Sequence, residues 1–325
     1  IDRRSWLSLA AGGLAAACSP STARGVEIAE IPRHRTLHVM NGTMVGRFGD
    51  TGVGNPYHFN ATHYTGHSAL WEPLFYFSAV GPGMIPWLAL DFTYSADATE
   101  LTIRLRDGVR WGDGTPFTAR DVAFTLLAVA GSPPTVAFSQ DLRAQVRDAF
   151  AADALTLVVR FAAPSPRFLF DYLTFKYDTG LKIVPEHVFR DRKLADFDFY
   201  DPNAGWPFGT GPYRVAAWTD TWKFLDRRND WWGSQVQFAD LPGPERIVVV
   251  PYADENRLAM GMTRGEIDHS WTMVHSTARA LVGEGVDGAR TGGNLDGAYA
   301  PAGKPQSGSA LSERMALMTY SFGRP

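Results

Sequence analysis

LTIRLRDGVRWGDGTPFTARDV, residues 101–122, encodes a strand, a tight turn, a short return and the start of a helix. Apolar and polar residues alternate from Leu101 to Arg106, and this period of two predicts a half-buried strand. Asp107-Gly108 and Asp113-Gly114 are turn dipeptides, because glycine adopts positive φ at little cost and aspartate bonds its own backbone. We therefore expect a hairpin with one buried face.

A helix start lies at the end of the same stretch. Thr118 and Asp121 have the spacing of a capping box, and an apolar run from Val122 to Val129 follows them. The threonine would accept hydrogen bonds from the first free amides, and the aspartate would favour the positive end of the helix. These residues predict a scaffold that feeds a hairpin into a helix, with no ligand contact of its own.

Elsewhere the pattern predicts a few further elements. A short β-prone run predicts a first strand, and a second run predicts another strand before the middle of the chain. A helix is expected over Thr65–Phe77, interrupted at Pro73, and a second helix is expected in the last third. The two strands are Thr36–Met40 and Ala154–Phe161, and the second helix is Ala253–Met262.

Five more motifs follow one another along the chain. They are LWEPL at Leu70–Leu74, IPWLA at Ile85–Ala89, GTGPY at Gly209–Tyr213, RNDWW at Arg228–Trp232 and GEID at Gly265–Asp268. Together with residues 101–122 they resemble the extracytoplasmic solute-binding proteins of ABC importers, in the peptide/nickel/oligosaccharide-binding branch called family 5. The order and spread of the motifs, over about residues 36–270, are hard to obtain by chance.

The resemblance implies an α/β fold of the type II periplasmic binding protein kind. It implies a lobe with a mixed sheet, a smaller appended α+β subdomain, and a second lobe that is largely missing, because the resemblance ends near residue 270 and Gly-, Ala- and Ser-rich sequence follows. A truncated or frameshifted product and a natural short homologue both fit this pattern. The expected parts are an export signal at 1–17, a flexible tether at 18–35, lobe I at 36–76 and 171–265, the subdomain at 77–170, and the start of the hinge or second lobe with an irregular tail at 266–325.

The function that the resemblance implies is solute capture without catalysis or cofactor. The chain would bind a peptide or an oligosaccharide in the periplasm, as a monomer, and deliver it to ABC permease subunits. One lobe by itself would bind its ligand weakly or not at all. A nickel-binding transport protein, a metal-dependent enzyme and a non-transport receptor with the same fold are the alternatives.

Composition agrees with an exported globular protein. The chain has 325 residues, 45% of them hydrophobic, which suffices for one or two sizeable cores. Its net charge is −3 and its charged residues are interspersed, so it has no basic stripe of the kind that binds nucleic acid. The ten tryptophans indicate mainly aromatic packing in the core, and they could also provide flat surfaces on which sugar rings stack.

The N-terminus reads as an export leader. Arg3-Arg4 precedes the apolar run Trp6–Ala17, which is too short to span a bilayer. The paired arginines resemble a twin-arginine signal, and a general secretory leader is the alternative. Cys18, the only cysteine, follows the run and resembles a lipoprotein attachment site, although the leucine lies one position further from it than usual. Cleavage after Ala17 or Ala23 without lipidation is the alternative.

The ligand-binding residues come mainly from the resemblance, which places the segment before the first helix at the border of the cleft. There, amide, hydroxyl and imidazole groups alternate with aromatic rings, as in pockets with apolar walls and few polar groups. We expect Asn60, Thr62 and His63 to supply polar groups. Phe59 and Tyr64 would stack against the ligand, and Asn41, after the first strand, is a further candidate.

Catalytic or metal-binding motifs would favour an enzyme or a metal carrier over this interpretation. The chain has no G-x-S-x-G, H-E-x-x-H or P-loop sequence. Both Gly-x-Gly stretches run into proline, so neither starts the helix that a dinucleotide site needs. His58, His63 and His67 could ligate Ni²⁺, but no carboxylate or cysteine beside them completes a shell, and we predict no metal site.

Overall fold

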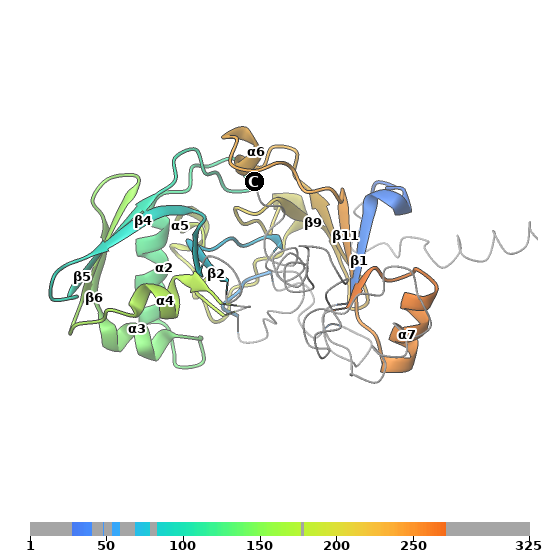
Figure 1. Cartoon of the computed structure of the whole chain (residues 1–325). Helices are drawn as coiled ribbons and strands as arrows, with labels where there is room; N and C mark the ends of the chain where they lie inside the picture. The colour runs from blue at the N-terminus through green and yellow to red at the C-terminus, as the bar shows by residue number, and fades with distance from the viewer. Residues whose placement is uncertain are drawn as a thin grey trace, which may run out of the picture.

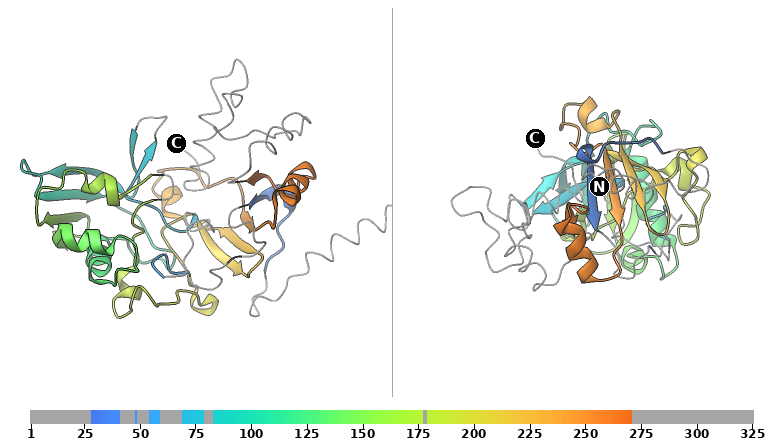
Figure 2. Two further views of the ribbon diagram at one scale, coloured as in Figure 1. Left: turned by 90° about the horizontal axis from the view of Figure 1, so that it is seen from below. Right: turned by 90° about the vertical axis from the view of Figure 1, so that its right-hand side faces the viewer.

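The computed structural model describes residues 28–40, 48, 54–58, 69–78, 83–176 and 179–270. Its strands form three sheets, of five, three and four strands. Figure 1 shows the four-stranded and five-stranded sheets toward opposite ends of the molecule, and the view from below in Figure 2 agrees. The architecture is mixed α/β, as the sequence predicts.

The five-stranded sheet mixes parallel and antiparallel pairs. In it β1 lies between β12 and β11 and is parallel to both, whereas β10 runs antiparallel to β11 and β9. A 3-10 turn, η1 (Arg33–Arg35), leads into β1. The strands are β1 (Thr36–Met40), β9 (Tyr213–Trp218), β10 (Lys223–Arg227), β11 (Arg246–Val250) and β12 (His269–Ser270), in the order β12-β1-β11-β10-β9.

The four-stranded sheet is antiparallel and contains the strand predicted at the start of residues 101–122. Its strands are β4 (Ala89–Tyr94), β5 (Glu100–Leu105), β6 (Val146–Ala151) and β7 (Thr156–Phe161), in the order β4-β5-β7-β6. The helices α2 (Ala119–Gly131) and α3 (Ser139–Gln145) belong to the same part of the chain, and α2 packs on β6 and β7.

The remaining elements join these two parts. A small sheet orders its strands as β3-β2-β8, with β2 (Phe75–Ser78), β3 (Gly83–Pro86) and β8 (Thr174–Phe175). The short helices are α4 (Phe168–Tyr172), α5 (Glu186–Phe189), η3 (Pro202–Ala204), α6 (Trp232–Gln235) and α7 (Glu255–Thr263). Within the described ranges, no helix is both long and apolar enough to cross a bilayer.

The strand, the two Asp-Gly turns and the helix start predicted for residues 101–122 are confirmed. The predicted hairpin is wrong for the strand itself, because β5 pairs with β4 and β7 and the bridge described within this stretch joins Arg110 to Pro116. Leu101, Ile103 and Leu105 are buried on one face of β5 while the residues between them are not. The predicted capping box is present at α2, where Asp121 Oδ2 accepts from the Thr118 amide at 2.8 Å. The first strand, Thr36–Met40, has the predicted bounds.

The helix expected over Thr65–Phe77 is wrong for the part that the structure describes. Residues 71–73 belong to no helix or strand and Phe75–Ser78 forms β2, which pairs with β3 and β8. Pro73 has no amide hydrogen and disfavours helical backbone in the residue before it. The aromatic residues after it satisfy their backbone groups through distant strands, which local spacing does not reveal.

One large apolar core runs through the described residues, with a smaller cluster beneath α7. In the smaller cluster Leu258 of α7 and Ile267 cover Met40, the last residue of β1, and all three are buried. The helix therefore seals one face of the five-stranded sheet beside the edge where β1 ends.

Candidate functional site

The parallel strands of the five-stranded sheet end at one edge. Met40, Val250 and Ser270 are the last residues of β1, β11 and β12, and the register pairs Val39 with both Val249 and His269. Ligands of open α/β sheets bind outside the carboxyl ends of parallel strands, where neighbouring loops diverge. This edge, which we call the strand-end edge, is therefore the candidate site.

The antiparallel strand β10 starts at the strand-end edge. Its first residue, Lys223, pairs with Val249 on one side and with Trp218 on the other. The lysine is fully buried, and its ammonium nitrogen lies 3.4 Å from the centre of a Trp218 ring and 5.5 Å from that of Phe48. Because these rings cover the cation, Lys223 supports the edge from within and presents no charge to a ligand.

Trp222 offers the aromatic surface of this edge. It ends the β9–β10 turn, where its amide donates to Thr219 Oγ1 at 2.9 Å. Its ring is partly exposed and stacks on Phe224, with centroids 6.0 Å apart and planes 3° from parallel. Such a flat, half-buried surface can stack with a sugar ring or an apolar side chain.

Sequence reasoning did not single out Trp222. The available signal was the spacing of Trp222 and Phe224, since residues two apart in a strand share a face. The place of Trp222 beside the carboxyl end of β11 depends on the register of β10, which no local pattern shows.

The predicted ligand-binding residues fall outside the described residues. This holds for Asn41, Phe59, Asn60, Thr62, His63 and Tyr64, and for the predicted lipidation site Cys18. Their roles stay predictions.

The described start of the predicted cleft segment is structural. The Asn55 side chain is fully buried and donates to the carbonyl oxygens of Leu194 at 2.8 Å and Phe197 at 2.9 Å. The buried Tyr57 hydroxyl donates to the Lys182 carbonyl at 2.7 Å. These polar groups therefore fix the chain to its neighbours.

No metal centre is formed by the described residues. His58 lies 3.6 Å from Asp198, while His63 and His67 are not among the described residues. Within those ranges no group of three His, Cys, Asp or Glu side chains is arranged to hold an ion.

A second histidine pair does not form a hydrolytic relay. His187 Nε2 lies 2.7 Å from Asp113 Oδ2, and the Thr115 hydroxyl lies 3.5 Å from the same nitrogen. In a relay the carboxylate and the hydroxyl bind opposite ring nitrogens. The pair instead ties the 111–115 turn to α5.

Four of the motifs that carry the family resemblance, LWEPL, IPWLA, GTGPY and RNDWW, meet in the core. Glu72 is 3% exposed, and its two carboxylate oxygens accept from the indole nitrogens of Trp87 at 3.0 Å and Trp232 at 2.7 Å. Burial raises the pKa of the Glu72 carboxyl to about 7, although hydrogen bonds from Trp232, Trp87 and Thr210 oppose the rise. Glu72 is thus the polar centre of a structural junction.

Three glycines and an arginine complete this junction. The Gly211 amide donates to the Leu70 carbonyl at 2.8 Å, and the Gly112 amide donates to the Gly209 carbonyl at 2.9 Å. Arg228, which is 5% exposed, donates to the carbonyls of Gly211 and Trp111 at 3.1 and 3.3 Å. These four motifs therefore hold the two parts of the fold together, whereas GEID leads into β12 and places Ile267 against Met40 at the end of β1.

Comparisons with known proteins show which proteins this chain is similar to. The family model described as "Bacterial extracellular solute-binding proteins, family 5 Middle" matches residues 83–294. Protein XP55 of Streptomyces lividans is 32% identical over 198 residues, 60% of this chain and 32% of that protein. A putative ABC transporter peptide-binding protein of Brucella ovis is 29% identical over 243 residues, 71% of this chain and 42% of its own length.

A solved structure shares the fold. The periplasmic oligopeptide-binding protein of Thermotoga maritima superimposes with a TM-score of 0.66 at 25% identity, over 78% of this chain and 45% of its own. With mannohexaose bound, the same protein gives a TM-score of 0.63. The chain thus spans between about a third and under half of the length of these relatives.

Proposed function

Because this chain belongs to the bacterial extracellular solute-binding proteins of family 5, we propose that it captures a small solute outside the cytoplasm for an ABC importer. The observation that carries the proposal is the strand-end edge, where three parallel strands end and where the partly exposed Trp222 directly precedes β10, the strand next to β11. The solute would be handed to permease subunits in the membrane. The likeness to the Brucella peptide-binding protein supports this assignment.

The proposed mechanism is capture by closure. A ligand that binds a closed state more tightly than an open one shifts the population toward the closed state, and the closed state is what a permease recognises. The strand-end edge would form one wall of the closing cleft. Asn41, Phe59, Asn60, Thr62, His63 and Tyr64 are proposed to contribute polar and stacking groups to the same wall.

The proposed solute is a peptide or an oligosaccharide. Trp222 stacked on Phe224 suits the flat face of a pyranose, and the mannohexaose complex of the Thermotoga protein supports the oligosaccharide choice. The Brucella and Thermotoga proteins are described as peptide-binding, which supports the peptide choice.

The test is hydrogen exchange of the full chain with short peptides, with mannohexaose and with Ni²⁺, each at millimolar concentration because one wall is expected to bind weakly. We expect one organic class to protect the β9–β10 turn and the residues after Val250. Trp222→Ala should weaken that ligand at least about tenfold, a loss of about 1.4 kcal/mol. Phe77→Ala is the matched control, because Phe77 is an exposed aromatic residue, 38% accessible, on β2. Protection confined to other segments would refute the assignment of this edge, whereas no protection with any ligand would agree with one lobe that does not bind by itself.

The alternatives make different predictions in this experiment. A nickel carrier using His58, His63 and His67 would respond to Ni²⁺, and His63→Ala would abolish the response. A non-transport receptor would protect the same edge as a transporter, so its partner decides between them. Crosslinking to permease subunits supports transport, and crosslinking to a sensor protein refutes it.

The proposal includes an extracytoplasmic location with Cys18 as a lipid attachment point. A diacylated cysteine would hold the protein at a membrane surface, since each buried methylene adds about 0.8 kcal/mol. We expect Cys18→Ala to move the expressed protein from the membrane fraction to the soluble fraction, with Ser19→Ala as the control. An unchanged distribution would show that Cys18 is not the anchor.

A further inference from the structure

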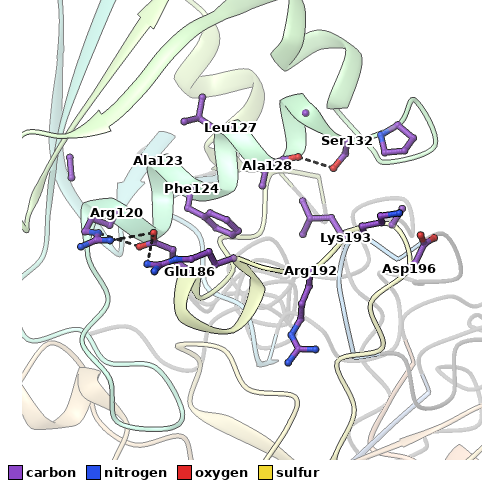
Figure 3. A pocket seen from close by; sticks show the side chains of 16 residues that line it. Arg120, Ala123, Phe124, Leu127, Ala128, Ser132, Glu186, Arg192, Lys193 and Asp196 are labelled. Atoms are coloured by element: carbon purple, nitrogen blue, oxygen red, sulfur yellow. Dashed lines mark hydrogen bonds and ion pairs between the residues drawn. The ribbon is translucent and has the colours of Figure 1, made fainter.

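A groove lies far from the strand-end edge, between α2 and the residues that follow α5. Its volume is about 860 Å³, and its residues come from the exposed side of α2 and from 190–196. Figure 3 shows Phe124 between an ionic cluster, Arg120 with Glu186, and Lys193 beyond it. In Figure 1, α2 and the five-stranded sheet lie toward opposite ends of the molecule.

The floor of the groove is an apolar face of α2 that solvent reaches. Ala123, Phe124, Leu127 and Ala128 all line it, with the spacing of one helix face. Leu127 is 43% exposed, although the opposite face of α2 is already buried through Val122 and other residues. A surface helix normally covers one apolar face only, so this second face indicates a partner.

The opposite wall is held in place by buried contacts. The side chain of Asn55 donates to the Leu194 and Phe197 carbonyls from inside the fold. Arg192 lies with its guanidinium 4.3 Å from the Phe197 ring centre and 5.3 Å from a Trp206 ring centre. A preformed groove loses little conformational entropy when it is occupied.

The charge of the groove selects its occupant. Its lining includes four cationic side chains against two acidic ones, Glu186 and Asp196. Glu186 already pairs with both Arg120 and Arg190, at 3.2 and 2.9 Å, and these arginines remain 65% and 55% exposed. Their unused donors can therefore receive a carboxylate in a two-pronged geometry.

We propose that this groove binds an acidic amphipathic helix of a partner protein. Apolar side chains of that helix, spaced three or four residues apart, would lie on Phe124, Leu127 and Ala128, and its carboxylates would pair with Arg120, Arg190 and Lys193. The groove is open along α2, which suits a segment of a larger molecule better than a small ligand enclosed on most sides.

The test is fluorescence anisotropy of the full chain with a labelled helical peptide that carries leucines at that spacing and glutamates around them. A second peptide with lysine in place of every glutamate is the charge control. We expect the lysine peptide, and the Leu127→Asp variant with the glutamate peptide, each to bind at least about tenfold more weakly. Lys193→Glu should weaken binding less, and added salt should weaken it further.

Matched variants separate the groove from general surface effects. Leu90→Asp changes a leucine of similar exposure, 41%, on β4, and Arg147→Glu reverses an exposed charge on β6. Both should bind as the parent does. Equal binding of the two peptides, or unchanged binding by Leu127→Asp, would overturn the proposal. The assay contains no transported solute, so its failure would leave the proposed solute capture untouched.

Discussion

Gly209→Ala is expected to lower the free energy of unfolding by about 4 kcal/mol or more, or to prevent folding. A Cβ atom at this position would lie 1.9 Å from the Leu70 carbonyl oxygen and 2.6 Å from its carbonyl carbon. Those atoms are backbone, so no side-chain rotation relieves the overlap. Any shift of the chain there also strains the hydrogen bonds that join Gly112 to Gly209 and Gly211 to Leu70.

Urea unfolding of the variant and of a control glycine measures this effect. Gly243→Ala is the control, because its added Cβ would meet no atom within 4 Å, and its unfolding free energy should stay within about 0.5 kcal/mol of the parent. If Gly209→Ala is insoluble, Gly211→Ala gives a second reading, since its Cβ would lie 2.4 Å from the Ala69 oxygen. If the variants at both positions are as stable as the control, the fold does not depend on the close approach of Gly209 and Gly211 to the backbone of Ala69 and Leu70.

This prediction gives the GTGPY motif its physical meaning. The sequence rejects a dinucleotide loop there, because Pro212 follows where a helix should start. In the structure Gly209 and Gly211 let their backbone lie close to that of Ala69 and Leu70, because glycine has no Cβ atom. Sequence spacing excluded the nucleotide site but did not identify Leu70 as the neighbour.

Elements with local causes were predictable from the sequence. The alternation in β5, the capping box of α2 and the Asp-Gly turns each depend on residues within a few positions of one another. β2 was missed because its hydrogen bonds go to β3 and β8, and the second of these lies about 100 residues away. The apolar spacing predicts a helix interrupted at Pro73, whereas the proline disfavours helical backbone around it.

The candidate site was less predictable than the fold. Met40 and Val250 end two distant strands and Trp222 precedes a third, and only the register of the sheet brings these positions to one edge. The residues that the resemblance assigned to ligand binding lie outside the described parts, so they add no geometry to the strand-end edge. Recognition of the family therefore supports the proposed function but does not identify the contacting atoms.

Glu72→Gln is expected to change how stability depends on pH. In the folded protein the Glu72 pKa is about 7, against 4.5 for an ordinary glutamate, so the folded state holds this proton more tightly than the unfolded state does. The contribution of this proton to the free energy of unfolding is present in full below about pH 4.5. It falls as the pH rises to about 7 and is then constant. The gap between the two pKa values corresponds to about 3 kcal/mol.

Other buried groups titrate in the same range, so the stability of the parent alone does not isolate Glu72. Burial lowers the pKa of His38, and it lowers that of His269 to about 4. Each of these histidines binds its proton more weakly in the folded state, and its contribution to stability therefore rises with pH while that of Glu72 falls. The difference between variant and parent removes these shared contributions.

Between about pH 4.5 and pH 8, we expect the free energy of unfolding of Glu72→Gln to rise by about 3 kcal/mol relative to that of the parent, as measured by urea unfolding. Near pH 4.5 the variant should be less stable by about 1 to 3 kcal/mol, because its amide nitrogen faces an indole N–H and leaves one of Trp87 and Trp232 without an acceptor. Glu186→Gln is the control, because its side chain is 20% exposed and its two arginine partners are largely exposed, and it should show no change of this size over the same pH range. A Glu72→Gln curve that also stays parallel would mean that the buried carboxyl ionises as it does in water, and that Arg228 and the surrounding donors compensate fully for its burial.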